Sequence, residues 1–101
     1  MMHKFSANNI IYNVEVFHGS AKDGDKVSSR WGVDFDKVLT IIEETAEKYN
    51  GFVLLVTPYS DCIVAKVVTD NNTDGYEVVI TPKVGYENNQ AIADIIDTEL
   101  S

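Results

Sequence analysis

Proline, glycine and cysteine are scarce in this chain and long apolar runs are absent, so several classes of protein are excluded at once. With two prolines and six glycines among 101 residues, the chain is neither fibrous nor of low complexity. Apolar runs such as residues 52–56 fall far short of the roughly 20 residues that a membrane-spanning helix needs. The opening residues lack the apolar core of a signal peptide, so we expect a cytoplasmic protein, in the host cytoplasm if a phage encodes it.

Side chains that commonly carry catalysis or bind metals are equally scarce. Cys62 is the single cysteine, so it cannot form a disulfide within the chain, and His3 and His18 are the only histidines. These residues lack the close spacing of zinc ligands, and no spacing pairs Cys62 with a histidine base. The acidic segment 70–75 is interpreted as a polar hairpin loop, because it lacks the closing glutamate of a calcium-binding loop. We therefore predict no catalytic residue, no metal and no cofactor, and a binding protein rather than an enzyme.

Basic residues are also few, which limits the possible partners. Sixteen acidic residues face eight basic ones, a formal net charge of −8. Residues 51–101 carry eight of the acids but only two bases, Lys66 and Lys83. Because contacts to phosphate need lysine and arginine, neither direct nucleic-acid binding nor binding to an anionic membrane is expected. The composition instead favours a partner protein with a basic surface.

The hydrophobic pattern predicts one small α+β domain over residues 1–101. Strands are expected where apolar residues alternate or run together, over residues 10–17, 52–57, 62–69 and 76–81.

Two helices are expected from apolar residues at helical spacing, over residues 34–49 and 89–100. Asp34 and Asn89 are interpreted as their N-caps, and Asn50 with the following glycine as the stop of the first. Residues 1–9 are interpreted as a loose start, and residues 18–32, which show no periodicity, as a long loop.

The element order β-α-β-β-β-α predicts a four-stranded mixed sheet, in which the first helix joins two parallel strands by a right-handed crossover. The later strands are apolar on both faces, with Phe52, Leu54 and Val56 pointing one way and Val53 and Leu55 the other. Something must therefore cover the second face, and two alternatives stay open. Either the helices lie on opposite faces, or a partner subunit packs there.

Two groups of residues are candidates for contact with a partner. Arg30 and Trp31 adjoin each other in the long loop, and these residue types dominate interface hot spots. Trp31 could equally fasten the loop onto the core. The second group comprises acidic residues on the polar faces of the two expected helices: Asp36, Glu43 and Glu47 on the first, and Asp94, Asp97 and Glu99 on the second. The alternative interpretation of this group is an ordinary solvated surface.

The function favoured by this sequence is inhibition or modulation of a basic, nucleic-acid-handling protein, of the anti-CRISPR or anti-restriction kind made by phages. The acidic residues would imitate nucleic-acid phosphates. A length of ~30 Å of duplex DNA carries roughly 18 phosphate charges, so a protein with a net charge of −8 can imitate only part of a duplex. A homo-oligomeric structural or accessory subunit, with a homodimer through a sheet face, is the first alternative. A small ligand-binding module or enzyme that uses the long loop is the second.

Overall fold

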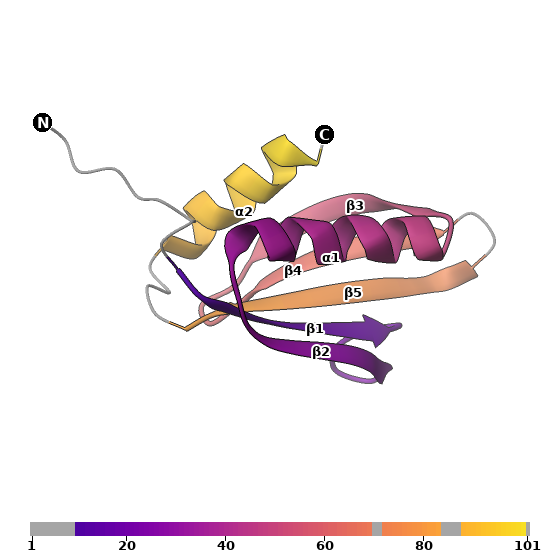
Figure 1. The fold of residues 1–101 in the computed structure, drawn as a ribbon. Coiled ribbons are helices and arrows are strands. Elements are labelled where there is room, and N and C mark those ends of the chain that lie inside the picture. Colours follow the sequence, from indigo (N-terminus) through magenta and orange to yellow (C-terminus); the bar gives the residue numbers. More distant parts are fainter. Residues whose placement is uncertain (1–9, 70–71, 84–87, 101) are drawn as a thin grey trace, which may run out of the picture.

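The computed structural model describes residues 10–69, 72–83 and 88–100, and it builds five strands and two helices from them. The expected loose start and the tip of the polar loop at residues 70–71 lie outside the described residues. The elements in chain order are β1 (Tyr12–His18), β2 (Asp25–Val33), α1 (Phe35–Lys48), β3 (Gly51–Pro58), β4 (Ile63–Thr69), β5 (Asn72–Pro82) and α2 (Asn89–Glu99) (Figure 1).

The strands form one sheet in the order β2-β1-β5-β4-β3, and every pair in it is antiparallel. The α+β class is confirmed, whereas the four-stranded mixed sheet is wrong. Strand β2 reverses the chain before α1 begins, so no parallel crossover forms. Helix α1 then carries the chain from the β2 edge of the sheet to the opposite edge, where β3 lies.

Strand β2 occupies much of the segment that the sequence predicts to be a loop. It pairs with β1 through a hairpin, with register shifts between Tyr12 and Val14 and between Val16 and Phe17. Each shift interrupts the two-residue alternation, because a bulge adds a residue to one strand only. Most of β2 is also exposed. A strand that buries little and changes register carries almost no hydrophobic periodicity, which explains why the pattern failed to predict it.

Helix α1 begins and ends close to the predicted residues. The Asp34 carboxylate accepts a hydrogen bond from the Lys37 backbone N–H at 2.9 Å, so it is the N-cap. Asn50, with φ of 55°, takes the left-handed conformation that ends the helix before β3. For α2 the predicted cap is wrong, because Asn89 is the first helical residue. The Asn89 side chain is buried, and its Nδ2 donates to the Tyr59 carbonyl at 2.8 Å, which ties α2 to the β3–β4 turn.

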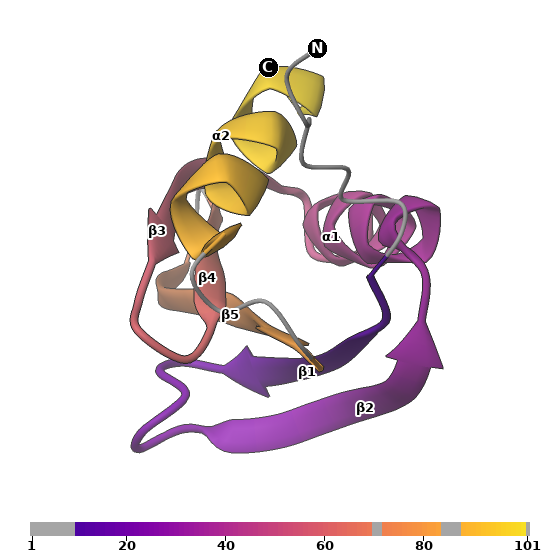
Figure 2. The ribbon, with the colours of Figure 1, turned by 90° about the vertical axis from the view of Figure 1, so that its left-hand side faces the viewer.

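Both helices lie on the same face of the sheet, as the end view shows (Figure 2). One continuous core fills the space between them and the sheet, and its fully buried side chains include Ile42, Ile63, Ile80 and Ile96. The alternative in which the helices lie on opposite faces is therefore wrong. No described helix or loop covers the other face, which we call the outer face.

Strand β3 departs from the predicted alternation in a way that exposes apolar side chains. Its register against β4 shifts between Val53 and Leu55. As a result Val53 and Val56 both contact the core, while Leu54 and Leu55 are both exposed. Among the described residues, no helix is both long enough and apolar enough to cross a membrane.

We expect Asp34→Ala to lower the free energy of unfolding by about 1 kcal/mol, because it leaves the Lys37 N–H without its capping acceptor. Urea titration followed by circular dichroism would measure the change. Asp36→Ala is the control: it removes a carboxylate from the same turn but no cap bond, and alanine's better helix propensity offsets the lost dipole interaction. Equal destabilisation by both substitutions would contradict the capping role.

Candidate functional site

The acids that the sequence singles out lie mainly on the side of the helices that points away from the sheet. Asp36, Glu43 and Glu47 are all exposed, and their spacing of seven and four residues places them on one stripe of α1. Asp94 and Asp97 form a similar exposed stripe on α2. We call these five residues the acidic face. Because both helices lie on one face of the sheet (Figure 2), the fold places both stripes in one helix layer.

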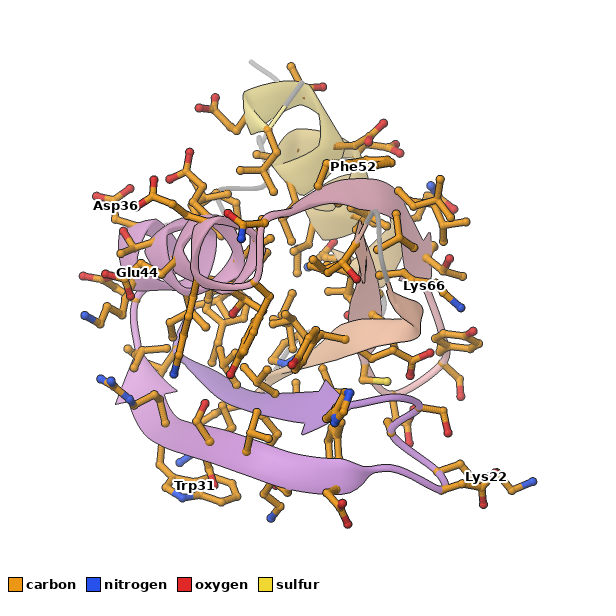
Figure 3. The ribbon with its side chains drawn as sticks, turned by 90° about the vertical axis from the view of Figure 1, so that its right-hand side faces the viewer. Lys22, Trp31, Asp36, Glu44, Phe52 and Lys66 are labelled. Carbon is orange, nitrogen blue, oxygen red and sulfur yellow. The ribbon has the colours of Figure 1, made fainter. Side chains whose placement is uncertain are left out.

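Two further helix carboxylates lie outside these stripes. Glu99 follows Asp97 by two residues, which places it about 200° further round the helix, although it is exposed. The structure therefore does not bring Glu99 together with the rest of its predicted group. Glu44 is exposed on α1 and points sideways rather than away from the sheet (Figure 3).

The net charge is concentrated in the helix layer. Helix α1 with its cap Asp34, together with α2, contains eight acidic and two basic residues, a net of −6 out of the chain's −8. The outer face is balanced in contrast. Glu15 forms a salt bridge of 2.8 Å with Lys26, and Lys66 lies opposite Glu77 in neighbouring strands. The negative charge is therefore concentrated on the helix side of the molecule. This asymmetry does not follow the division of the sequence into residues 1–50 and 51–101, because each half contributes one of the helices.

The predicted pair Arg30 and Trp31 is separated by the fold, because neighbouring residues of a strand point to opposite faces. Arg30 lies opposite Val14, on the helix side of the sheet. Trp31 lies on the outer side (Figure 3) and is 64% exposed, so it does not fasten a loop onto the core. A single contact anchor made of both side chains is not supported by this arrangement.

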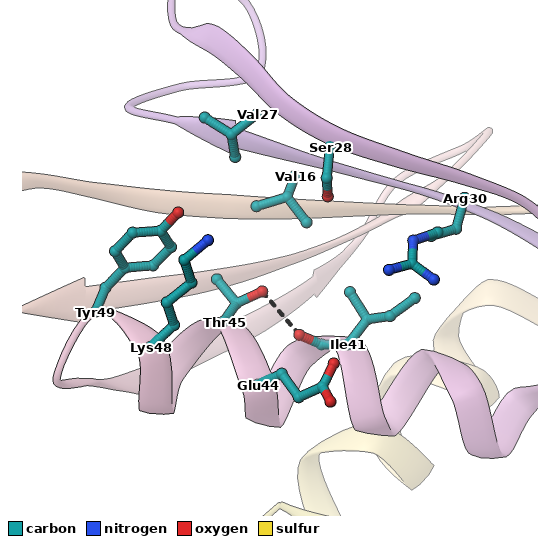
Figure 4. A pocket seen from close by; sticks show the side chains of 9 residues that line it. All are labelled: Val16, Val27, Ser28, Arg30, Ile41, Glu44, Thr45, Lys48 and Tyr49. Carbon is teal, nitrogen blue, oxygen red and sulfur yellow. Dashed lines mark hydrogen bonds between the residues drawn. The ribbon is translucent and has the colours of Figure 1, made fainter.

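Arg30 instead lines a groove between β2 and α1, with a cavity volume of about 180 Å³ (Figure 4). Its apolar side includes Val16 and Ile41, and its polar side includes Glu44 and Lys48. Among the described residues, no carboxylate lies within ion-pair distance of Arg30 or Lys48.

The Lys48 ammonium lies 5.3 Å from the centre of the Tyr49 ring, a cation–π contact. The Tyr49 ring in turn stacks on Tyr76 with 3.8 Å between ring centres, and Tyr76 stacks on His18 at 4.8 Å. Of these rings, that of Tyr49 lines one end of the groove (Figure 4), whereas Tyr76 and His18 lie behind it in the stack. Burial, and then the neighbouring Tyr49, raise the pKa of the Tyr76 hydroxyl, so it stays protonated at neutral pH. The lining of the groove offers two cations, one carboxylate and the hydroxyls of Ser28, Thr45 and Tyr49, and its cations can attract a small anion.

The described residues contain no group of three or more histidine, cysteine, aspartate or glutamate side chains that could hold a metal ion. Cys62 lies in the turn before β4 and is partly buried. Burial raises the pKa of its thiol, and the charge of Asp61 and a hydrogen bond with Asp61 raise it further. At neutral pH the thiol is therefore protonated, the form that is a poor nucleophile and a poor metal ligand.

The comparisons with known proteins give no match: no family model, no curated protein and no solved structure resembles this chain closely enough to be matched. Inferences about function therefore rest on the geometry alone.

Sequence reasoning missed two features of the molecule's surface. The groove depends on β2, which carries no periodicity, so the sequence could not predict that Arg30 and Lys48 line one groove. The exposed pair Leu54 and Leu55 results from a bulge in β3, and a bulge leaves no mark in the order of residues.

We expect Asp61→Asn to lower the pKa of the Cys62 thiol and to speed its alkylation by iodoacetamide at a fixed pH near neutral. The substitution removes a negative charge that disfavours the thiolate, whereas the contribution of burial remains. The rate measured from neutral to alkaline pH should rise at a lower pH in the variant than in the natural chain. Asp25→Asn, which removes an exposed charge elsewhere, is the control. An unchanged pH profile in Asp61→Asn would contradict the role of Asp61.

Proposed function

We propose that this protein binds a basic surface of a nucleic-acid-handling protein through its acidic face, and thereby inhibits or modulates that protein. The observation that carries the proposal is the charge distribution: a net of −6 gathers in the two helices on one face of the sheet. A surface of this kind attracts cationic partners and speeds their association. The carboxylates would occupy positions that nucleic-acid phosphates otherwise take.

The magnitude of the charge limits what the acidic face can imitate. Five carboxylates on two helices match only part of a basic channel, since duplex DNA carries a charge about every 1.7 Å of axis. The proposal is therefore partial occupation of a nucleic-acid-binding surface, as a phage-type anti-CRISPR or anti-restriction protein would require. It involves protein binding without chemistry.

The test begins with capture of partners by the tagged full chain from a bacterial lysate, with washes at low and then high salt. We expect a nucleic-acid-handling protein that elutes as salt rises, because screening weakens contacts between exposed charges. The purified partner should then lose binding to its own nucleic acid when the chain is added. A partner that elutes only with denaturant, or one that still binds nucleic acid, would count against the proposal.

The acidic face itself is tested by neutralising it without changing its shape. The triple variant Asp36→Asn, Glu43→Gln and Glu47→Gln should bind the captured partner roughly tenfold more weakly or worse, and its affinity should depend less on salt. The control variant carries an equal change of charge at exposed residues outside the helices: Asp23→Asn, Asp25→Asn and Asp61→Asn. If the control weakens binding as much as the helix variant, the net charge matters and the acidic face does not.

A second candidate function, binding of a small anion in the groove, is favoured by the Arg30 and Lys48 side chains, which have no carboxylate partner among the described residues. Thermal unfolding of the full chain with a panel of phosphates and carboxylates would test it. Binding to the folded state raises the melting temperature, and Arg30→Gln should abolish that rise. A panel without any stabilising anion would end this candidate.

A further inference from the structure

The two edges of the sheet are built differently. Strand β2, at one edge, carries three charged residues (Asp25, Lys26 and Arg30), and its pairing with β1 shifts register twice. Charged side chains on an edge strand discourage it from pairing with another chain, and repeated bulges add to this effect. Strand β3, at the other edge, shifts register once against β4 but contains no charged residue over its whole length, Gly51–Pro58.

The β3 edge is also apolar at its surface. Phe52, Leu54 and Leu55 are 53%, 52% and 45% exposed. Phe52 lies opposite Val68 of β4, so the apolar surface continues onto the next strand of the outer face. Strand β3 pairs with β4 on one side, and among the described residues no other backbone hydrogen bond reaches it. An edge strand leaves alternate N–H and C=O groups without partners, and these can template a further strand.

We propose that β3 pairs with β3 of a second copy of this chain, antiparallel about a two-fold axis, so that two sheets join into one. Antiparallel pairing of a strand with its own copy is self-complementary, as two-fold symmetry requires. Phe52, Leu54 and Leu55 of each copy would then be buried at or beside the new pairing. This inference is independent of the proposed function, because it concerns the edge of the sheet and not the acidic face.

Charge opposes a second copy less at this edge than at the acidic face. Like-charged helix layers would repel if two copies met through their acidic faces, whereas the outer face balances Glu15 with Lys26 and Lys66 with Glu77. Two copies can therefore approach through β3 and the adjoining outer face without opposing a charged surface there.

The available area sets the expected strength. The exposed parts of the three large side chains amount to roughly 300 Å² per copy, since a large side chain has about 150–250 Å² to bury. Two copies would bury about 600 Å² from these residues alone, whereas a stable interface needs about 1,200 Å² in total. The backbone and the smaller side chains of β3 must supply the remaining area. We therefore expect a weak dimer, with a dissociation constant in the micromolar range.

Added salt should strengthen the dimer, whereas it should weaken the binding of a partner protein by the acidic face. Helix α2 packs on β3, so the two copies of α2 lie on either side of the two-fold axis. Each α2 carries three acidic residues and no basic one, so the helices repel each other across the axis. Because salt screens this repulsion and leaves apolar burial intact, the dimer should tighten as salt rises.

Sedimentation equilibrium of the full chain over a range of concentrations and salt tests the proposal. We expect Leu55→Lys to weaken dimerisation at least tenfold, because it places a charge on the pairing edge. The added lysine also lowers the net negative charge, so extra repulsion between copies would not explain the loss. Val27→Lys, at a residue of the β2 edge that is 46% exposed, is the matched control and should leave the dimer unchanged. Circular dichroism checks that both variants are folded.

Hydrogen exchange provides a second, independent readout. Backbone amides of β3 should become better protected as protein concentration rises, while those of β2 should not. A chain that stays monomeric at all concentrations, or a dimer that Val27→Lys breaks and Leu55→Lys does not, would overturn the proposal. A dimer that weakens with salt would also overturn it, since that response requires attraction between charges at the interface.

Discussion

The structure depends on the burial of a single face of the sheet. All five strands direct one set of side chains toward the helices. The buried core is one cluster, and its buried residues come mainly from β1, β4, β5, α1 and α2. Since the hydrophobic effect is satisfied on that face alone, the second sheet face and both sheet edges remain available to solvent or to a partner. Every candidate surface in this protein is a consequence of that one-sided packing.

The same packing explains why the charges separate. A helix that buries one stripe must place its polar residues on the opposite stripe, and both helices lie on one side of the sheet (Figure 2). Their carboxylates therefore point away from the sheet together. The outer face belongs to strands whose charged residues alternate with apolar ones and pair across strands, so it stays balanced. The two proposed contacts consequently use different forces: screened attraction at the acidic face, and apolar burial with strand pairing at the β3 edge.

Strand β3 shows how a small irregularity changes what a surface can do. Regular alternation would direct Leu55 into the core and leave a narrower apolar strip outside. The register shift exposes Leu54 and Leu55 side by side on a strand that carries no charge. At the opposite edge, the register shifts of β2 lie next to charged residues, and one of these, Arg30, lines the groove. The bulge in β3 thus leaves an apolar edge without charges, whereas the bulges in β2 lie on an edge that carries charged residues.

The sequence by itself determined the elements with strong periodicity: the first strand with its buried alternate residues, both helices, the Asp34 cap and the left-handed stop at Asn50. These features depend on residues close in the chain, so local order is enough to predict them. The tertiary structure alone decided the position of β2, the antiparallel order of the sheet, the gathering of two acidic stripes on one side and the separation of Arg30 from Trp31. Each of these depends on bulges or on contacts between distant segments, and neither leaves a periodic trace in the order of the residues.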